Sequence, residues 1–400
     1  MNLVDTKIFD EYLVVVKRVM LKQQDVFKVG AYGKYQKFRI PTIITTKKGS
    51  ILITVEARYG KGGDWDSSDI LMRKSVDNGS AFGDPVRLLS HVDFGNGPVN
   101  NFVMIPHRNS DRISAVFSPG YAKIYSMYSD DDGDTFSSPV DITPVIENFR
   151  DDYPWKVCAT GPGHSVQLES GRIIVPVWFS DGKGKEFGSG RLGHRPSVLS
   201  VIYSDDFGEN WEMGEVICRD GDLLYGIRIT NPSETVAVQV NDSSVMFNIR
   251  TESSPNRRLI ARSEDGVSDF RMEGFHESLV EPVCMGSLLR CSNADEVGGD
   301  YLLFVNPDTL DKTDQGRRVS EPVAGSFRDR KRLTLKVSED QGNTWPFTKL
   351  IEKGPTGYSD LTQSGDGSIF CIYEYGSENE SCESLSVRLS QLDIKCSLKT

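Results

Sequence analysis

The sequence is poor in the features that mark metalloenzymes, membrane proteins and disulfide-rich proteins. Only five histidines occur in 400 residues, and none stands in HExxH or HxH spacing, so we expect neither a metal site nor a metal hydrolase. The longest apolar runs, such as Leu13–Val16, are far shorter than the roughly 20 residues of a membrane-spanning helix. The seven cysteines are an odd number without a CxxC pair, which predicts reduced and mostly buried thiols.

Basic residues are fewer than acidic ones, and the start of the sequence does not have the pattern of a secretory leader. The chain carries 46 Lys and Arg against 57 Asp and Glu, a formal charge of −11, which argues against nucleic acid or an anionic membrane surface as a partner. Acidic residues precede the short apolar run near residue 13, and no small-residue cleavage site follows it. We therefore expect a cytoplasmic protein without a transmembrane segment.

Short apolar or alternating runs recur along most of the chain, and clusters of Gly, Asp, Asn and Ser separate them. This pattern is typical of a many-stranded antiparallel β fold. The predicted strands are Ile51–Glu56, Ile113–Phe117, Ile124–Tyr128, Ile173–Trp178, Val198–Tyr203, Val245–Ile249, Leu259–Ala261, Tyr301–Val305, Leu333–Val337 and Ile369–Tyr373. No linker-like change in composition divides the chain. We expect one all-β domain over residues 31–400, with residues 1–30 as an extension packed on it.

A short motif of the form S-x-D-x-G-x-T-W/F repeats along the chain. Clear copies begin at Ser129, Ser204 and Ser338, and weaker ones at Ser75 and Ser263. In such a turn the aspartate accepts hydrogen bonds from the backbone of the turn, the glycine adopts positive φ, and the aromatic side chain packs beneath. A unit repeated in this way predicts a β-propeller built from four-stranded antiparallel sheets. The aspartates of the motif are expected to stabilise turns and not to catalyse.

The segment Phe38–Pro41 reads FRIP and stands ahead of the first copy of this motif, which is called an Asp box. FRIP followed by Asp boxes resembles the exo-α-sialidase (neuraminidase) family. Further matching segments follow in the order of that family: Glu56–Arg58, Thr160–Leu168, Asn231–Glu234, Phe247–Arg250, Arg330–Thr334, Gly357–Leu361 and Tyr373–Glu374. The resemblance implies a six-bladed propeller that removes terminal α-linked sialic acid from oligosaccharides, glycoproteins or gangliosides, without a cofactor.

The resemblance also implies the reacting pair, with Tyr358 as nucleophile and Glu234 as the base that takes its proton. A sialoside carries a carboxylate on its anomeric carbon, which would repel an Asp or Glu nucleophile, and sialidases use tyrosine instead. A phenol with a pKa of about 10 is a weak nucleophile at neutral pH, so it needs an adjacent base. The expected reaction is retaining, through a sialyl-enzyme linked to tyrosine.

Three arginines are implied to bind the carboxylate of the sugar, because guanidinium groups stay charged and offer paired donors. The matches are Arg39, Arg250 and Arg330, although Arg330 competes with its neighbours in the crowded segment Arg328–Arg332. Glu374 resembles the buried acid that orients the first arginine. Three clustered cations would repel one another without such a counter-charge.

The resemblance assigns the general acid and base to Asp64, in a glycine-rich stretch suited to a mobile lip over the site. Asp66 and Asp69 are rivals for this role. Arg58 is implied to contact the O4 side of the sugar, and an ordinary ion pair at a strand end is the alternative for it.

One segment departs from the family. Where the family often has an aspartate lining the N-acyl side of the pocket, this chain reads Asn96–Phe102 without one, so the preferred acyl group stays open. Transfer of the sialyl group to another sugar and a non-catalytic, sialic-acid-binding propeller are the alternative functions. A non-catalytic propeller would be expected to lose the tyrosine–glutamate pair or the arginines, and this chain keeps them.

Overall fold

The computed structural model describes residues 21–184, 191–240, 244–291, 300–310, 330–376 and 386–392. β-Strands are the main secondary structure of these residues, which also contain one short helix, α1 (Pro144–Glu147), and two 3-10 turns at His91–Phe94 and Asn148–Asp151. In the described part of the chain, no helix has the length and apolar character needed to cross a membrane. Nine of the ten predicted strand segments lie inside observed strands, and the tenth, Ile124–Tyr128, begins one residue before the strand Tyr125–Ser129. The prediction of an all-β fold is therefore confirmed.

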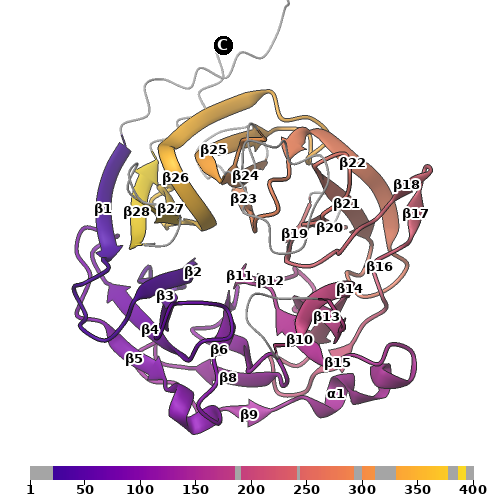
Figure 1. The fold of residues 1–400 in the computed structure, drawn as a ribbon. Coiled ribbons are helices and arrows are strands. Elements are labelled where there is room, and N and C mark those ends of the chain that lie inside the picture. Colours follow the sequence, from indigo (N-terminus) through magenta and orange to yellow (C-terminus); the bar gives the residue numbers. More distant parts are fainter. Residues whose placement is uncertain are drawn as a thin grey trace, which may run out of the picture.

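The strands are grouped into antiparallel sheets arranged around a common centre (Figure 1). The first sheet contains β2 (Lys37–Thr45), β3 (Ile51–Arg58), β4 (Ser68–Ser75) and β5 (Val86–Leu89). The second contains β6 (Val99–Pro106), β7 (Ile113–Pro119), β8 (Tyr125–Ser129) and β9 (Val140–Asp141), and β11 (Gly163–His164) runs parallel to β6. The third contains β10 (Val157–Thr160), β13 (Ile173–Gly182), β14 (Gly193–Ser204) and β15 (Glu212–Met213), flanked by β12 (Val166–Gln167) and β16 (Cys218–Arg219). The fourth contains β19 (Thr235–Gln239), β20 (Val245–Ile249), β21 (Arg257–Ser263) and β22 (Arg271–Val280). A small hairpin, β17 (Leu223–Leu224) and β18 (Ile227–Arg228), precedes the fourth sheet.

The remaining strands form one seven-stranded group that contains the long strand β26 (Phe347–Gln363). The order is β23 (Ser287–Cys291), β24 (Tyr301–Pro307), β25 (Lys331–Ser338), β26 (Phe347–Gln363), β27 (Ile369–Tyr375), β28 (Ser386–Leu392) and β1 (Leu21–Phe27). The first half of β26 pairs with β25 and its second half with β27, so this group is two four-stranded sheets that share β26. When β26 is divided between these two sheets, the described residues contain six main sheets. The predicted β-propeller class is confirmed.

The N-terminal strand closes the ring of sheets. β1 pairs antiparallel with β28 along its length, so the first described segment of the chain is the edge strand of the last sheet. The boundary predicted at residue 30 does not hold for this strand, because residues 21–27 are part of the propeller and are not an extension packed on it. The pairing gives the last sheet its fourth strand and joins the first described segment of the chain to the last one. The rest of the predicted extension, residues 1–20, lies outside the described residues.

Each Asp box forms the turn that the motif predicted. In the first, the Ser75 hydroxyl donates to Asp77 at 2.8 Å, the Ala81 N–H donates to the same carboxylate at 2.9 Å, and Gly79 has a φ of 75°. The other four boxes repeat the serine–aspartate bond. These aspartates are occupied by their own turns, as expected.

The register places the two ends of each sheet on opposite faces of the propeller. In the first sheet, Arg39 on β2 lies opposite Glu56 on β3 at one end. At the other end Ile51 on β3 lies opposite Ser75, the first residue of the Asp box. The Asp boxes therefore lie on the face away from Arg39.

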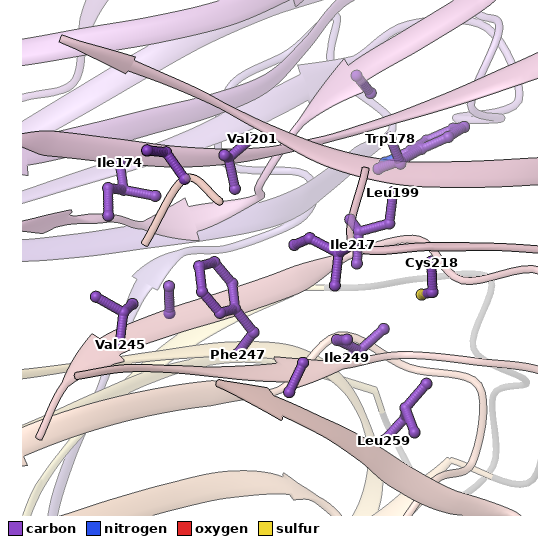
Figure 2. Packing of buried hydrophobic residues seen from close by; sticks show 14 of the residues in the cluster. Ile174, Trp178, Leu199, Val201, Ile217, Cys218, Val245, Phe247, Ile249 and Leu259 are labelled. Carbon is purple, nitrogen blue, oxygen red and sulfur yellow. The ribbon is translucent and has the colours of Figure 1, made fainter. Parts of the chain in front are cut away.

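Apolar side chains fill the space between neighbouring sheets. Figure 2 shows the cluster between the third and fourth sheets, where Ile174 and Val201 face Val245 and Phe247, all fully buried. Similar clusters lie between the other sheets. Five of the cysteines are buried free thiols, as predicted, and Cys382 and Cys396 lie outside the described residues. Tight packing between the sheets fixes where the inner strands begin and end, and so where their polar side chains meet.

Candidate active site

Tyr358 lies in the second half of β26 and is almost fully buried, with 6% of its surface exposed. Its hydroxyl donates a short hydrogen bond to the carboxylate of Glu234, which stands just before β19. Arg250, just after β20, donates through Nη1 to the Tyr358 hydroxyl at 2.8 Å and also bonds Glu234. Burial, followed by the negative charge of Glu234, raises the pKa of Tyr358 well above its usual range. The phenol therefore keeps its proton and has a carboxylate in place to accept it.

Three guanidinium groups surround the tyrosine ring. The guanidinium carbons of Arg39 and Arg330 lie 5.3 Å and 5.6 Å from the ring centroid, and Arg250 contacts the hydroxyl. The Nε atoms of Arg250 and Arg330 are buried and have no hydrogen-bond partner among the described residues. Clustered guanidinium groups carry positive charge and planar, paired donors, so this arrangement suits an anionic ligand such as a carboxylate.

The sequence left Arg330 in competition with its neighbours, and the structure separates them. Arg330 faces the tyrosine ring and donates to the Val283 carbonyl, while the Arg332 side chain is exposed. Arg328 lies outside the described residues. Arg330 is thus the member of the segment that the structure places beside Tyr358.

Glu374 on β27 is fully buried and connects two parts of the site. Its Oε1 accepts from the Arg39 side chain at 2.7 Å and from the Ile40 N–H at 2.8 Å, and its Oε2 accepts from the Tyr358 N–H at 3.0 Å. A Cβ atom at Gly357 would lie 2.0 Å from this carboxylate, so only glycine fits there. Glu374 orients Arg39 and also fixes the backbone of the tyrosine.

Arg58 lies at the end of β3 and is buried, with only 1% of its side chain exposed. It binds Glu56 through two nitrogens, at 3.0 Å and 2.7 Å, and donates to Asp64 at 2.6 Å. This ion pairing at a strand end is the alternative that the sequence left open for Arg58, and the pair with Glu56 is buried. Glu56 also accepts from the Asn101 N–H at 2.8 Å, so one carboxylate positions both the arginine and the Asn96–Phe102 segment.

Asp64 is half-exposed on the loop between β3 and β4. Partial desolvation works to raise its pKa, but the positive charges of Arg58 and Arg39 outweigh it and hold the pKa below the usual range. Its two rivals are engaged elsewhere. Asp66 accepts from the backbone of its own loop at Lys61 and Gly63. Asp69 is buried and accepts from two tyrosine hydroxyls and from His91. Asp64 is the carboxylate of the three that faces the arginines.

A single family model covers residues 117–371, more than half of the chain, and its description is "BNR repeat-like domain". The chain belongs to the BNR repeat-like domain family. The Asp boxes are the repeats from which such a domain takes its name, so the predicted family is confirmed.

The relatives of this BNR repeat-like domain are sialidases. It is 26% identical over 368 residues to a sialidase of Bacteroides fragilis, covering 84% of this chain and 60% of that one. It is 26% identical over 383 residues to a sialidase of Micromonospora viridifaciens, covering 88% and 52%. It is 23% identical to mouse sialidase-3 over 380 residues, covering 86% and 88%. The chain thus spans 60% or less of the length of the two bacterial relatives.

Solved structures with a similar fold are also sialidases. The Hadza microbial sialidase Hz136 gives a TM-score of 0.72 at 23% identity, covering 92% of this chain and 68% of that one. A Trypanosoma rangeli sialidase in complex with the inhibitor DANA gives 0.69 at 18% identity, covering 93% and 59%. At these identities the comparison establishes the fold of the BNR repeat-like domain.

Sequence reasoning missed a group of rings beside Asp64. Trp65 and Tyr121 lie 5.0 Å apart between centroids, and His194 lies 4.6 Å from Tyr121 and 5.3 Å from Trp178. Burial and then the charge of Asp64 raise the pKa of Tyr121, so its hydroxyl stays neutral. These residues come from four separate segments of the domain, and no spacing in the sequence connects them. For Glu56 there was a signal, since a residue two positions before Arg58 on a strand points to the same face.

In the ranges that the structure covers, no group of three or more His, Cys, Asp or Glu side chains could hold a metal ion. The charged groups of the site are arranged as ion pairs around Tyr358 and as donors without partners.

The arginine cluster gives a testable expectation for Arg250→Lys. A lysine keeps the charge but loses the planar, paired donors that match a carboxylate. Losing one charge-assisted bond of about 2 kcal/mol should raise KM for an aryl α-sialoside roughly 30-fold. Steady-state kinetics measures this. Arg172→Lys, which changes a similar bidentate pair with Asp205 on the Asp-box face, is the matched control and should leave KM unchanged. An unaltered KM in Arg250→Lys would remove Arg250 from the carboxylate site.

Proposed function

We propose that this protein is a retaining exo-α-sialidase that hydrolyses terminal α-linked sialic acid. The observation that carries the proposal is the hydrogen bond from the buried Tyr358 hydroxyl to Glu234, within a cluster of three arginines. The three clustered guanidinium groups offer the positive charge and the paired donors that a carboxylate needs. The sialidase relatives support the same substrate class.

The geometry supports a two-step reaction. In the first step the substrate carboxylate binds Arg39, Arg250 and Arg330, and the Tyr358 oxygen attacks the anomeric carbon as Glu234 takes the phenolic proton. The bond from that carbon to the leaving oxygen breaks, and Asp64 gives its proton to that oxygen. In the second step Asp64 takes a proton from water, and the water oxygen attacks the anomeric carbon. The bond from that carbon to the Tyr358 oxygen breaks, and Glu234 returns the proton to that oxygen. A neutral phenol suits this task because it avoids repulsion by the substrate carboxylate.

Asp64 is ionised in the ligand-free protein, but it must carry a proton to act as the general acid. Arg58 and Arg39 hold the pKa of Asp64 low, so the free carboxyl is ionised at neutral pH. A general acid needs a proton. Binding of the substrate carboxylate would neutralise part of the positive charge of Arg39 and displace water from the half-exposed Asp64. Both effects raise the pKa of Asp64, so we expect the substrate itself to favour its protonation.

The proposed substrates are sialylated oligosaccharides, glycoproteins or gangliosides. On the Asn96–Phe102 side of the site, Asn101 donates from its side chain to the Thr160 carbonyl at 2.8 Å. The neighbouring Asn100 is fully buried, and its amide atoms have no partner among the described residues. The segment thus carries neutral amides and no aspartate. Two substrates that differ only in the sugar, one carrying N-acetylneuraminic acid and the other its deaminated analogue, test the specificity. The ratio of their kcat/KM values measures the preference for the acyl group.

Proton NMR during incubation with an aryl α-sialoside tests the proposed function. A retaining sialidase releases the α-anomer of the free sugar first, and the β-anomer appears later by mutarotation. Release of the β-anomer first would contradict the tyrosine-linked intermediate. Adding lactose tests transfer to another sugar, because a transferase would form a new sialoside in place of free sialic acid. Absence of any turnover would favour the non-catalytic alternative.

Replacing Asp64 by Ala gives a separate prediction for the general acid. A nitrophenyl leaving group departs with little help from an acid, whereas the sugar alcohol of sialyllactose needs protonation. We expect kcat/KM for sialyllactose to fall by roughly 10²- to 10⁴-fold and to fall clearly less for the nitrophenyl sialoside. Asp66→Ala is the control on the same loop. Equal losses on the two substrates would show that Asp64 does not protonate the leaving group.

A further inference from the structure

The turn of the third Asp box carries a phenylalanine in an unfavourable backbone conformation. Phe207 has a φ of 63°, in the left-handed region that bulky side chains rarely adopt. The equivalent positions of three other boxes hold polar residues at similar φ, namely Asn78, Asp132 and Gln341. The turn itself therefore does not call for an aromatic residue here. Backbone strain of this kind is concentrated at functional sites in proteins.

The ring of Phe207 is exposed yet firmly supported. Of its surface 53% is open to solvent, while the ring stacks on His107 at 5.9 Å with an angle of 25° between the planes. His107 is buried, and its Nε2 lies 2.8 Å from the Ser114 hydroxyl. Burial, and then the charge of Arg112, lower the pKa of His107 to about 4, so its ring is neutral at pH 7. Phe207 is thus an apolar platform held from behind by a second ring.

A groove of about 460 Å³ lies beside this platform, and charged side chains line it. Arg112 binds Asp130 through two nitrogens, at 2.8 Å and 3.0 Å, and Glu209 through a third at 2.6 Å. Because a guanidinium has five N–H donors, these bonds leave two for a ligand, and each carboxylate keeps acceptor capacity. The volume lies within the range of small-molecule sites.

We propose that this groove on the Asp-box face binds a neutral saccharide, with one sugar ring stacked on Phe207. Pyranose rings present an apolar C–H surface, which is attracted to the electron-rich face of an aromatic ring. Their hydroxyl groups both donate and accept, and so match the mixed carboxylate and guanidinium edge formed by Asp130, Glu209 and Arg112. The excess of acidic groups disfavours an anionic sugar here.

This site is separate from the proposed catalytic centre. Phe207 follows Ser204, which pairs with Ile173 at one end of β14. His194, whose ring lies 5.6 Å from that of Trp65 beside Asp64, is at the other end of the same strand. A sugar bound at Phe207 would thus be held independently of the sialic acid bound near Tyr358. The inference does not rest on the proposed sialidase activity, because it uses neither Tyr358 nor the arginine cluster.

Saturation-transfer NMR with lactose, maltose and cellobiose at millimolar concentration tests the saccharide site. Free N-acetylneuraminic acid is added in excess to occupy the catalytic centre. We expect at least one disaccharide to bind the wild-type protein and the Gln341→Ala control, which changes the equivalent position of another box. Binding should weaken at least tenfold in Phe207→Ala and Phe207→Asn. The asparagine variant should keep or raise Tm because asparagine adopts positive φ readily, so its loss of binding would not reflect unfolding.

Three outcomes would overturn the proposal: no binding of any of the three disaccharides to the wild-type protein, binding that survives both Phe207 substitutions, or binding that N-acetylneuraminic acid displaces. Turnover of an aryl α-sialoside should be the same in the Phe207 variants and the wild-type protein. This readout distinguishes failure of the saccharide site from failure of the proposed sialidase function.

Discussion

Tyr358→Phe should abolish turnover of an aryl α-sialoside while leaving the fold intact. The substitution removes the one oxygen that would attack the sugar, so kcat should fall by roughly 10⁴-fold or more, as expected for loss of a nucleophile. The ring that lies between Arg39 and Arg330 is kept, and Glu234 stays paired with Arg250. No buried charge is left without a partner, so stability should change little. Single-turnover and steady-state assays, with circular dichroism as a check on folding, measure the effect.

The matched control for this substitution is Tyr121→Phe. Tyr121 is also a buried tyrosine whose pKa is raised by burial and by a nearby carboxylate, but its ring belongs to the group beside Asp64. It should retain most of the activity, because the proposed mechanism gives its hydroxyl no bond to form. If Tyr358→Phe were active and Tyr121→Phe inactive, the nucleophile would have to be reassigned.

Glu374→Gln should destabilise the protein and weaken substrate binding together. Glu374 accepts three hydrogen bonds in a fully buried position, two of them from backbone N–H groups. A glutamine turns one of its two acceptor positions into a donor that faces another N–H, and it leaves the Arg39 charge without compensation. Breaking a buried ion pair in this way costs about 3 kcal/mol, so the free energy of unfolding should fall by that amount. KM should rise because Arg39 loses its orientation.

Urea denaturation and steady-state kinetics measure the two effects of Glu374→Gln. Glu352→Gln is the control, because it weakens a pair with Arg388 at 3.4 Å in which both side chains are partly exposed. Such pairs contribute less than about 1 kcal/mol. Equal and small losses in both variants would mean that Glu374 is not needed to hold the site together.

Local sequence allowed much of the fold to be predicted. The Asp boxes fold as expected because the serine, aspartate and glycine that form each turn lie within a few residues of one another. Strands such as β13 and β24 were visible as apolar runs bounded by turn residues. The edge strand β1 was not predicted, because its partner β28 lies at the other end of the chain and no nearby residue indicates the pairing.

Motifs that resemble a known family supplied the names of the site residues, but not the choice among close neighbours. Asp64, Asp66 and Asp69 are the same residue type and lie close together in the sequence, so the sequence does not separate them. The structure does, because Asp66 accepts hydrogen bonds from its own loop and Asp69 from tyrosine hydroxyls. The rings of Trp65, Tyr121 and His194 were missed for the same reason, because each comes from a different segment.

The sequence by itself determined the all-β propeller class, the turns of the Asp boxes and the residue types of the proposed site. Only the tertiary structure decided that Tyr358 meets Glu234 across 124 residues of chain and that Glu374 meets Arg39 across 335. It also showed Phe207 as a supported, exposed ring beside a groove. The physical reason is that turns form from neighbouring residues, whereas these contacts depend on how whole sheets pack and close around the centre of the propeller.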